Sequence, residues 1–232
     1  LYRRRQRQMC IRDSYKSMSK QSVKFEDLIE IEPITVNQVK AFDAWSDGDH
    51  LVLAGSAGTG KTFIALYLAL QSVLEPYTSF NKVVLVRSVV PTREVGYLPG
   101  DIGEKVEPFE APYKNICLEL FSDTNSTYNK LINSHQMVFN TTSFIRGITI
   151  DNAIVVVDEM QNLNFHELDS VITRVGRDCR IIFSGDYHQS DFKDSYERDG
   201  IQRFLRIVEQ LKNFSVITFG SVSYTHLTLP TT

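Results

Sequence analysis

Apolar residues along this chain fall into short continuous runs, and stretches of helical character separate them. Six runs are predicted to be strands, at 51–54, 83–86, 136–139, 153–157, 180–183 and 216–219. Three longer stretches are predicted to be helices, at about 61–74, 165–175 and 200–211. Continuous apolar runs are typical of strands that are covered on both faces. The pattern therefore predicts an α/β fold with a mainly parallel sheet flanked by helices.

The pattern is interrupted between residues 91 and 134, where the sequence turns irregular. This stretch contains the polar run SDTNSTYN and four prolines, Pro91, Pro99, Pro108 and Pro112. We predict an insertion without regular structure here, and long loops of this kind are often functional.

The two ends of the chain differ from the rest. Residues 1–14 contain five arginines, residues 222–232 contain no charge, and both ends resemble translations of one sequencing adapter. Such segments are excluded from fold reasoning. The alternatives are a basic nucleic-acid-binding arm and a disordered polar tail. We expect the natural protein to be one domain at about 15–221, with Met18 as a candidate start.

Charge and cysteine content narrow the function classes. Leaving out residues 1–14, with five arginines and one aspartate, changes the net charge from −3 to −7, so a nucleic-acid contact needs a local basic patch. Cys117 and Cys179 have no C-x-x-C spacing, which argues against a zinc site or a disulfide framework. No apolar run is long enough to span a bilayer, and no convincing signal peptide is present. These features predict a cytoplasmic protein without a membrane partner.

The segment GSAGTGKT directly follows the run at 51–54 and fits the spacing G-x-x-x-x-G-K-[ST] at every position. In such a loop glycines turn backbone N–H groups toward phosphates, lysine reaches the β and γ phosphates, and the hydroxyl coordinates Mg²⁺. A glycine-rich turn that happens to precede a helix is the alternative, but a buried strand before and an apolar helix after favour a phosphate loop. The predicted nucleotide-binding residues are Gly55, Ser56, Ala57, Gly58, Thr59, Gly60, Lys61 and Thr62.

Two acids, Asp158 and Glu159, follow the run at 153–157. A buried strand delivers residues at its end to the carboxyl edge of the sheet, where ligands of α/β proteins bind. We predict that Asp158 and Thr62 hold Mg²⁺ and that Glu159 orients or deprotonates the attacking water. The alternative is that Asp158 or Asn162 caps the next helix, which explains one acid but not the pair.

Polar side chains elsewhere complete the candidate site. Gln189 in SGDYHQ follows the run at 180–183 and is predicted to sense the γ-phosphate, although a Gly-Asp turn is the simpler interpretation of the motif alone. Thr35, Asn37 and Gln38 precede the loop, and we predict that the amide of Gln38 pairs with an adenine edge. The equal alternative is a helix cap, because threonine and asparagine favour helix starts. Three arginines are candidates for neutralising phosphate charge or for surface ion pairs: Arg87, Arg146 and Arg174.

The order of these motifs resembles the PhoH family of phosphate-starvation-inducible ATPases, in particular the PhoH-like proteins of tailed phages. The resemblance covers most of 35–220 and is most specific in YLPGDIGEK and RGITIDNAIVVVDEMQN. It implies a RecA-like P-loop NTPase core related to superfamily one helicases, with ATP and Mg²⁺ at the loop and the acidic pair. It also implies that Gln38 lies near the base and that Gln189 is the γ-phosphate sensor.

The chain departs from the family pattern at Met160, where the family has alanine, and at Ser88, where it has proline. Beyond residue 220 the family continues into a segment with an arginine that approaches the nucleotide. In this chain the adapter-like sequence occupies that place. We therefore expect this chain to lack that arginine and a final helix, and hydrolysis by the chain as it stands to be in question.

Three functions compete for this sequence. The first is Mg²⁺-dependent ATP hydrolysis coupled to binding or remodelling of RNA or single-stranded DNA. The second is a nucleotide-gated interaction module with little turnover, and the third is a small-molecule kinase, which has no need of a water-activating acid beside the metal ligand. A homo-oligomeric ring would let one copy supply an arginine to its neighbour.

Overall fold

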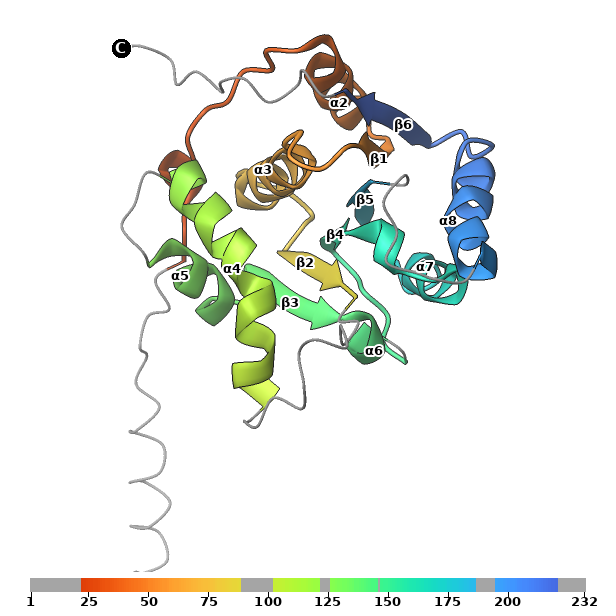
Figure 1. Ribbon diagram of the computed structural model, residues 1–232. Coiled ribbons are helices and arrows are strands. Elements are labelled where there is room, and N and C mark those ends of the chain that lie inside the picture. Colours follow the sequence, from red (N-terminus) through yellow and green to blue (C-terminus); the bar gives the residue numbers. More distant parts are fainter. Residues whose placement is uncertain (1–21, 89–101, 122–125, 146, 187–194, 221–232) are drawn as a thin grey trace, which may run out of the picture.

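The computed structural model describes residues 22–88, 102–121, 126–145, 147–186 and 195–220. Six parallel strands form one sheet in the order β3-β2-β4-β5-β1-β6 (Figure 1). The strands are β1 (His50–Gly55), β2 (Lys82–Arg87), β3 (Met137–Thr141), β4 (Ala153–Asp158), β5 (Arg180–Gly185) and β6 (Phe214–Phe219). The α/β fold with a parallel sheet is confirmed.

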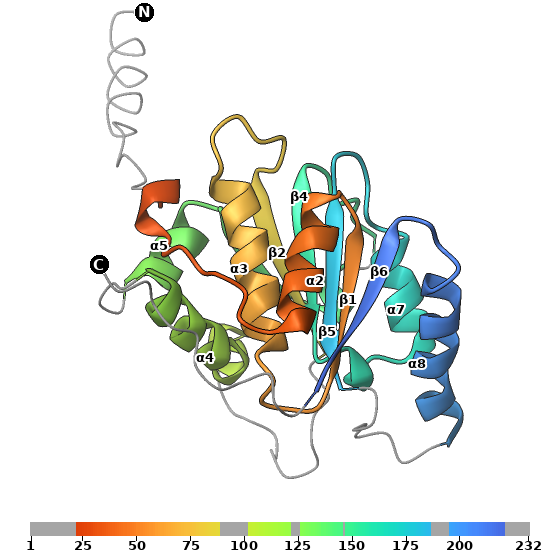
Figure 2. The same ribbon diagram turned by 90° about the horizontal axis from the view of Figure 1, so that it is seen from above.

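Helices cover both faces of this sheet. Figure 2 shows α2, α3, α4 and α5 on one side of the strands and α7 and α8 on the other. Short turns of helix, η1 (Phe25–Asp27), α6 (Thr142–Ile145) and η2 (Met160–Asn162), lie between the longer elements. The remaining helices are α2 (Val36–Ser46), α3 (Lys61–Leu74), α4 (Ile102–Phe121), α5 (Thr127–Asn133), α7 (Phe165–Ile172) and α8 (Ser195–Val208).

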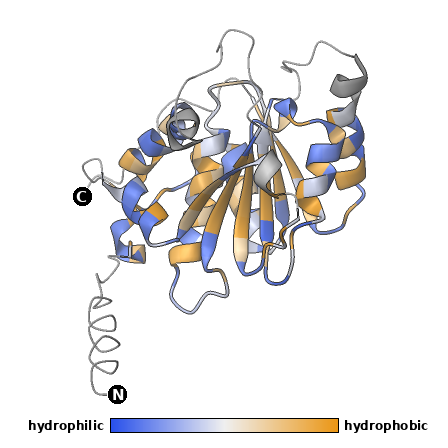
Figure 3. Ribbon diagram, turned by 90° about the horizontal axis from the view of Figure 1, so that it is seen from below, coloured by the Kyte–Doolittle hydropathy of each residue, from blue (hydrophilic) through white to orange (hydrophobic). Residues whose placement is uncertain are grey.

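The sheet divides the apolar core into two clusters because successive side chains of a strand point to opposite faces. On β1, Leu51 and Leu53 pack into the cluster beneath α3, whereas Val52 and Ala54 pack into the cluster beneath α7 and α8. The same alternation holds on β2 and β4. Figure 3 shows the resulting apolar colour along the strands. Because both faces of the sheet are buried, the strand sequences are continuous apolar runs.

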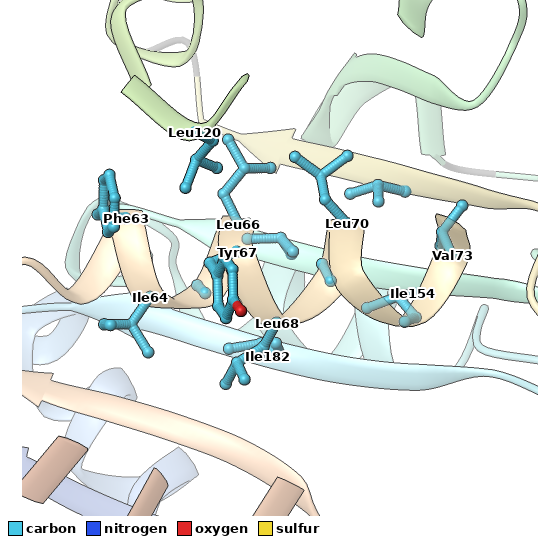
Figure 4. Packing of buried hydrophobic residues seen from close by; sticks show 14 of the residues in the cluster. Phe63, Ile64, Leu66, Tyr67, Leu68, Leu70, Val73, Leu120, Ile154 and Ile182 are labelled. Carbon is cyan, nitrogen blue, oxygen red and sulfur yellow. The ribbon is translucent and has the colours of Figure 1, made fainter. Parts of the chain in front are cut away.

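Helix α3 is the centre of the larger cluster. Eleven of its fourteen residues are buried, so it lacks the polar face of a surface helix. Figure 4 shows its side chains beside Leu120 of α4 and Ile182 of β5. Because sheet and helices enclose α3, its first residues are held in a fixed place at the carboxyl edge of the sheet.

The prediction of an irregular insertion at 91–134 is wrong for the described part of that stretch, which forms α4 and α5. Proline lacks the N–H that a helix interior needs, and its ring crowds the preceding turn. Pro108 and Pro112 nevertheless lie inside α4, four residues apart and both exposed, so the disturbed turn faces solvent. Tyr113 and Cys117, one turn apart, are buried on the opposite face and attach the helix to the core.

Candidate nucleotide-binding site

The glycine-rich loop joins β1 to α3 at the carboxyl edge of the sheet. Gly58 and Gly60 have φ of 76° and 78°, conformations that other residues rarely adopt. A pocket of about 280 Å³ opens over the loop. It is lined by loop residues from Ala57 onward and by residues at and just after the carboxyl ends of β4 and β5, so elements far apart in the sequence meet there.

Lys61, the first residue of α3, is folded over the loop. It is only 7% exposed, and its Nζ donates to the carbonyl oxygen of Ser56 at 2.7 Å and to Oγ1 of Thr59 at 3.2 Å. Burial lowers the pKa of Lys61, while the carboxylates of Asp186 and the acidic pair oppose that shift. A cation held among loop oxygens beside a pocket is suited to bind an anionic group.

Thr62 lies one residue further along α3, and its side chain reaches β4. Its Oγ1 donates to Oδ1 of Asp158 at 2.8 Å and lies 3.5 Å from Oγ of Ser184 on β5. Asp158 is buried at 3% exposed. The contacts across these strands follow from the strand order, because β5 pairs with both β1 and β4.

Hydroxyl and carboxylate oxygens of this kind fit Mg²⁺, which takes few protein ligands and completes its shell with phosphates and water. No group of three or more His, Cys, Asp or Glu suited to a metal occurs in the described part of the chain. Thr62 and Asp158 bring a hydroxyl and a carboxylate oxygen from two different elements together beside the phosphate loop.

Glu159 has a left-handed backbone conformation, with φ of 53°, directly after the last residue of β4. Gln161 connects it to the next strand: its Nε2 donates to Oε2 of Glu159, and its Oε1 accepts from the N–H of Asp186 at 3.0 Å. A Cβ added at Gly185 would meet that same Oε1, so a larger residue there would displace the Gln161 amide. The amide of Gln161, which sequence reasoning did not select, thus holds the second acid in place.

Helix α4 supplies the part of the site that sequence reasoning missed. Asn115, Ile116 and Glu119 line the pocket, and the hydroxyl of Tyr113 donates to Oδ2 of Asp158 at 2.9 Å. Burial, followed by the charge of Asp158, raises the pKa of Tyr113 well above its ordinary value, and the charge of Arg87 opposes this shift. The spacing of Tyr113 and Cys117, one helical turn apart, is the sequence signal that indicates this helix.

Gln38 caps the start of α2 in the structure. Its Oε1 accepts from the N–H groups of Ile34 at 2.8 Å and Thr35 at 3.1 Å, and Thr35 accepts from its N–H in return. This capping box is the alternative that the sequence left open. Gln38 is not among the residues that line the described pocket. Contact with a base stays a prediction.

The candidate arginines lie in different places. Arg87 ends β2 in register with Asp158, and its guanidinium lies 5.9 Å from the ring of Phe109. Arg174 follows α7, and its carbonyl accepts from Ile150, before β4, at the opposite edge of the sheet. Arg146 and the predicted sensor Gln189 lie outside the described residues, as do the segments 1–14 and 222–232.

A parallel sheet with a glycine-rich loop between strand and helix, and with an acid from a neighbouring strand beside the loop, defines a P-loop NTPase. The family model described as PhoH-like protein matches residues 30–226. The chain belongs to the PhoH family, as its resemblance in sequence predicts.

The chain is similar in sequence to curated relatives and in structure to solved proteins. A PhoH-like protein of Synechocystis sp. is 34% identical over 169 residues, covering 72% of this chain and 50% of the relative. One of Mycobacterium leprae is 28% identical over 193 residues, covering 83% and 54%. The chain thus spans about half the length of these relatives. A large terminase from a thermophilic bacteriophage is 15% identical with a TM-score of 0.49, covering 85% of this chain and 48% of that one.

None of the described helices combines the length and apolar character that crossing a bilayer requires.

Proposed function

We propose that this chain binds ATP with Mg²⁺ and hydrolyses it. The observation that carries the proposal is the hydrogen bond from Thr62 to Asp158 beside the buried Lys61, because it brings the end of the phosphate loop to an acid from another strand. Lysine would bind the β and γ phosphates, and loop N–H groups would surround them. The family membership supports the same assignment.

Each charged residue has a role in this proposal. Thr62 and Asp158 would hold Mg²⁺, which supplies neutralisation of the phosphate oxygens when bound. Glu159 would orient or deprotonate the attacking water, and Gln161 fixes its carboxylate through the amide described above. Gln189 and Gln38 keep the roles proposed from the resemblance, as sensor of the γ-phosphate and as a contact to the base.

Coupling of hydrolysis to RNA or single-stranded DNA is the second part of the proposal, and it rests on the family resemblance. A kinase of small molecules is disfavoured by Glu159, since phosphoryl transfer to an acceptor hydroxyl needs no activated water beside the metal ligand. A nucleotide-gated module remains the competing function, because it would use the same pocket with little turnover.

Turnover measured with and without single-stranded RNA or DNA separates these functions. Lys61→Ala serves as the blank, and Lys82→Ala, which removes a lysine from the start of β2 away from the loop, serves as the matched control. Binding of a fluorescent ATP analogue that Lys61→Ala abolishes and Lys82→Ala retains is expected, together with turnover that nucleic acid increases. Binding without turnover favours the module, and absence of binding by the folded chain overturns the proposal.

A further inference from the structure

The carboxylate of Asp158 is held from two sides. Thr62 on α3 donates to Oδ1 at 2.8 Å, and Tyr113 on α4 donates to Oδ2 at 2.9 Å. Asp158 stands at the end of β4, and the two donors come from helices that follow different strands. Both oxygens of the side chain are therefore engaged, and rotation of the carboxylate would break at least one of the two bonds.

Tyr113 is rigidly placed to make its bond. Its side chain is fully buried, and its ring lies 5.8 Å from that of Phe139 on β3 at an angle of 48°. A tyrosine in a core brings a polar hydroxyl that must find a partner, and a carboxylate gives the stronger, charge-assisted kind of hydrogen bond. Phenylalanine would fill the same space, so packing alone does not explain the hydroxyl.

We propose that Tyr113 is a positioning residue for the metal ligand: its hydroxyl fixes Asp158 in the orientation that keeps Oδ1 beside Thr62. The proposal rests on the proposed function, because it takes Asp158 and Thr62 as the Mg²⁺ ligands. Partners that orient metal ligands through hydrogen bonds typically change metal affinity 10–100-fold when they are removed.

The same bond links α4 to Asp158. Asn115 and Glu119, on the pocket side of this helix, lie within two turns of Tyr113. A shift of α4 that moved these side chains would also pull on Asp158. The hydroxyl thus ties the helix that borders the pocket to the acid that holds the metal.

The test compares Tyr113→Phe with Tyr128→Phe, which removes a buried hydroxyl from the neighbouring α5 and outside the pocket lining. Affinity for a fluorescent ATP analogue is measured while Mg²⁺ is titrated. We expect Tyr113→Phe to raise the half-saturating Mg²⁺ concentration about tenfold and to leave metal-free nucleotide affinity within about twofold. Tyr128→Phe should match the unchanged chain in both measurements.

A second readout needs no metal. Without Mg²⁺ or nucleotide, Tyr113→Phe should lower the Tm by about 4 °C or more, because Asp158 loses a hydrogen bond. In an Asp158→Ala background the same change should lower the Tm by less than half as much, since the two residues act as a pair.

The outcomes separate the two proposals. If the unchanged chain and Tyr128→Phe show no Mg²⁺-dependent nucleotide binding, the proposed function fails, and this inference with it. If both bind with Mg²⁺ and Tyr113→Phe has the same half-saturating concentration as they do, the positioning role alone is overturned. Equal Tm losses in the two backgrounds would also overturn it, because the hydroxyl would then act independently of Asp158.

Discussion

Substitution of Gly55 by alanine tests whether the first glycine of the loop is required by the loop or by the sheet beneath it. Gly55 ends β1 with φ of 144°, a region that residues with a Cβ rarely adopt. A Cβ built there would meet the carbonyl oxygen of Phe219 on β6, which is its partner in the sheet. The clash is with backbone, so no side chain is able to rotate away.

The expected loss has two parts. Holding alanine in so sparsely populated a backbone region costs about 1–3 kcal/mol. Moving backbone to admit a methyl group into a closely packed place adds about 1–3 kcal/mol. Together these amount to about 2–6 kcal/mol, a large share of the 5–15 kcal/mol by which a domain is typically stable.

Gly48→Ala is the matched control. Gly48 also has positive φ, 96°, but a Cβ there meets nothing within 4 Å. Urea denaturation followed by the fluorescence of the chain's single tryptophan gives the free energy of unfolding of each variant. We expect Gly55→Ala to lose about 1–3 kcal/mol more than Gly48→Ala. Equal losses would refute the contact with Phe219 as the reason for this glycine.

Three further substitutions address other features. Burial, followed by the charge of Arg180, lowers the pKa of His50 below its ordinary 6.5. As the pH falls below 6.5, the unfolded chain therefore binds a proton at His50 more readily than the folded chain, and the free energy of unfolding should decrease. His50→Gln should make the free energy of unfolding less dependent on pH, as measured by urea denaturation at several pH values. Arg180 donates to the carbonyl oxygens of Trp45 and Asp49, and its guanidinium lies 3.3 Å from the centroid of the Trp45 ring. Arg180→Lys should therefore cost about 1–2 kcal/mol in unfolding free energy, and a loss below about 0.5 kcal/mol would contradict this account. Glu159→Gln should keep nucleotide affinity while turnover falls at least about 100-fold in a phosphate-release assay, and turnover near that of the unchanged chain would exclude the acid as a base.

The sequence predicts the strands and α3 well because burial alone determines them. The helix predicted at 61–74 has the same limits in the structure, since glycine precedes it and the apolar stretch ends with it. The run at 83–86 extends by one polar residue at each end, because hydrogen bonds to β4 continue past the apolar segment. Helix α8 begins at Ser195, whereas the sequence predicted a start at about Gly200. Gly200 lies inside the helix, where its backbone approaches Phe165 closely, and does not mark the helix end.

The candidate site was predictable only where it lies at a strand end or in the glycine-rich loop and the helix start that follow β1. Asp158 and Thr62 could be chosen from local motifs, and their meeting follows from the carboxyl edge that parallel strands share. The contribution of α4 could not be predicted from local motifs, because Pro108 and Pro112 indicate that no helix continues through them. A helix accepts these prolines only if they lie on its solvent-facing side, and the sequence alone does not show which side the core covers. The bond from Tyr113 to Asp158 therefore could not be predicted from a stretch whose sequence looks irregular.

The strand order also determines when this site is able to form during synthesis. Leu51 of β1 pairs with Ile182 of β5, 131 residues later in the chain, and the other edge of β1 pairs with the still later β6. At about 5–20 residues per second, a ribosome takes about 7–26 seconds to make the residues between the two partners. During this interval the strand that carries the phosphate loop has been made without either of its neighbours. Strand β1 therefore stays without partners in the sheet until the chain has been made as far as β5.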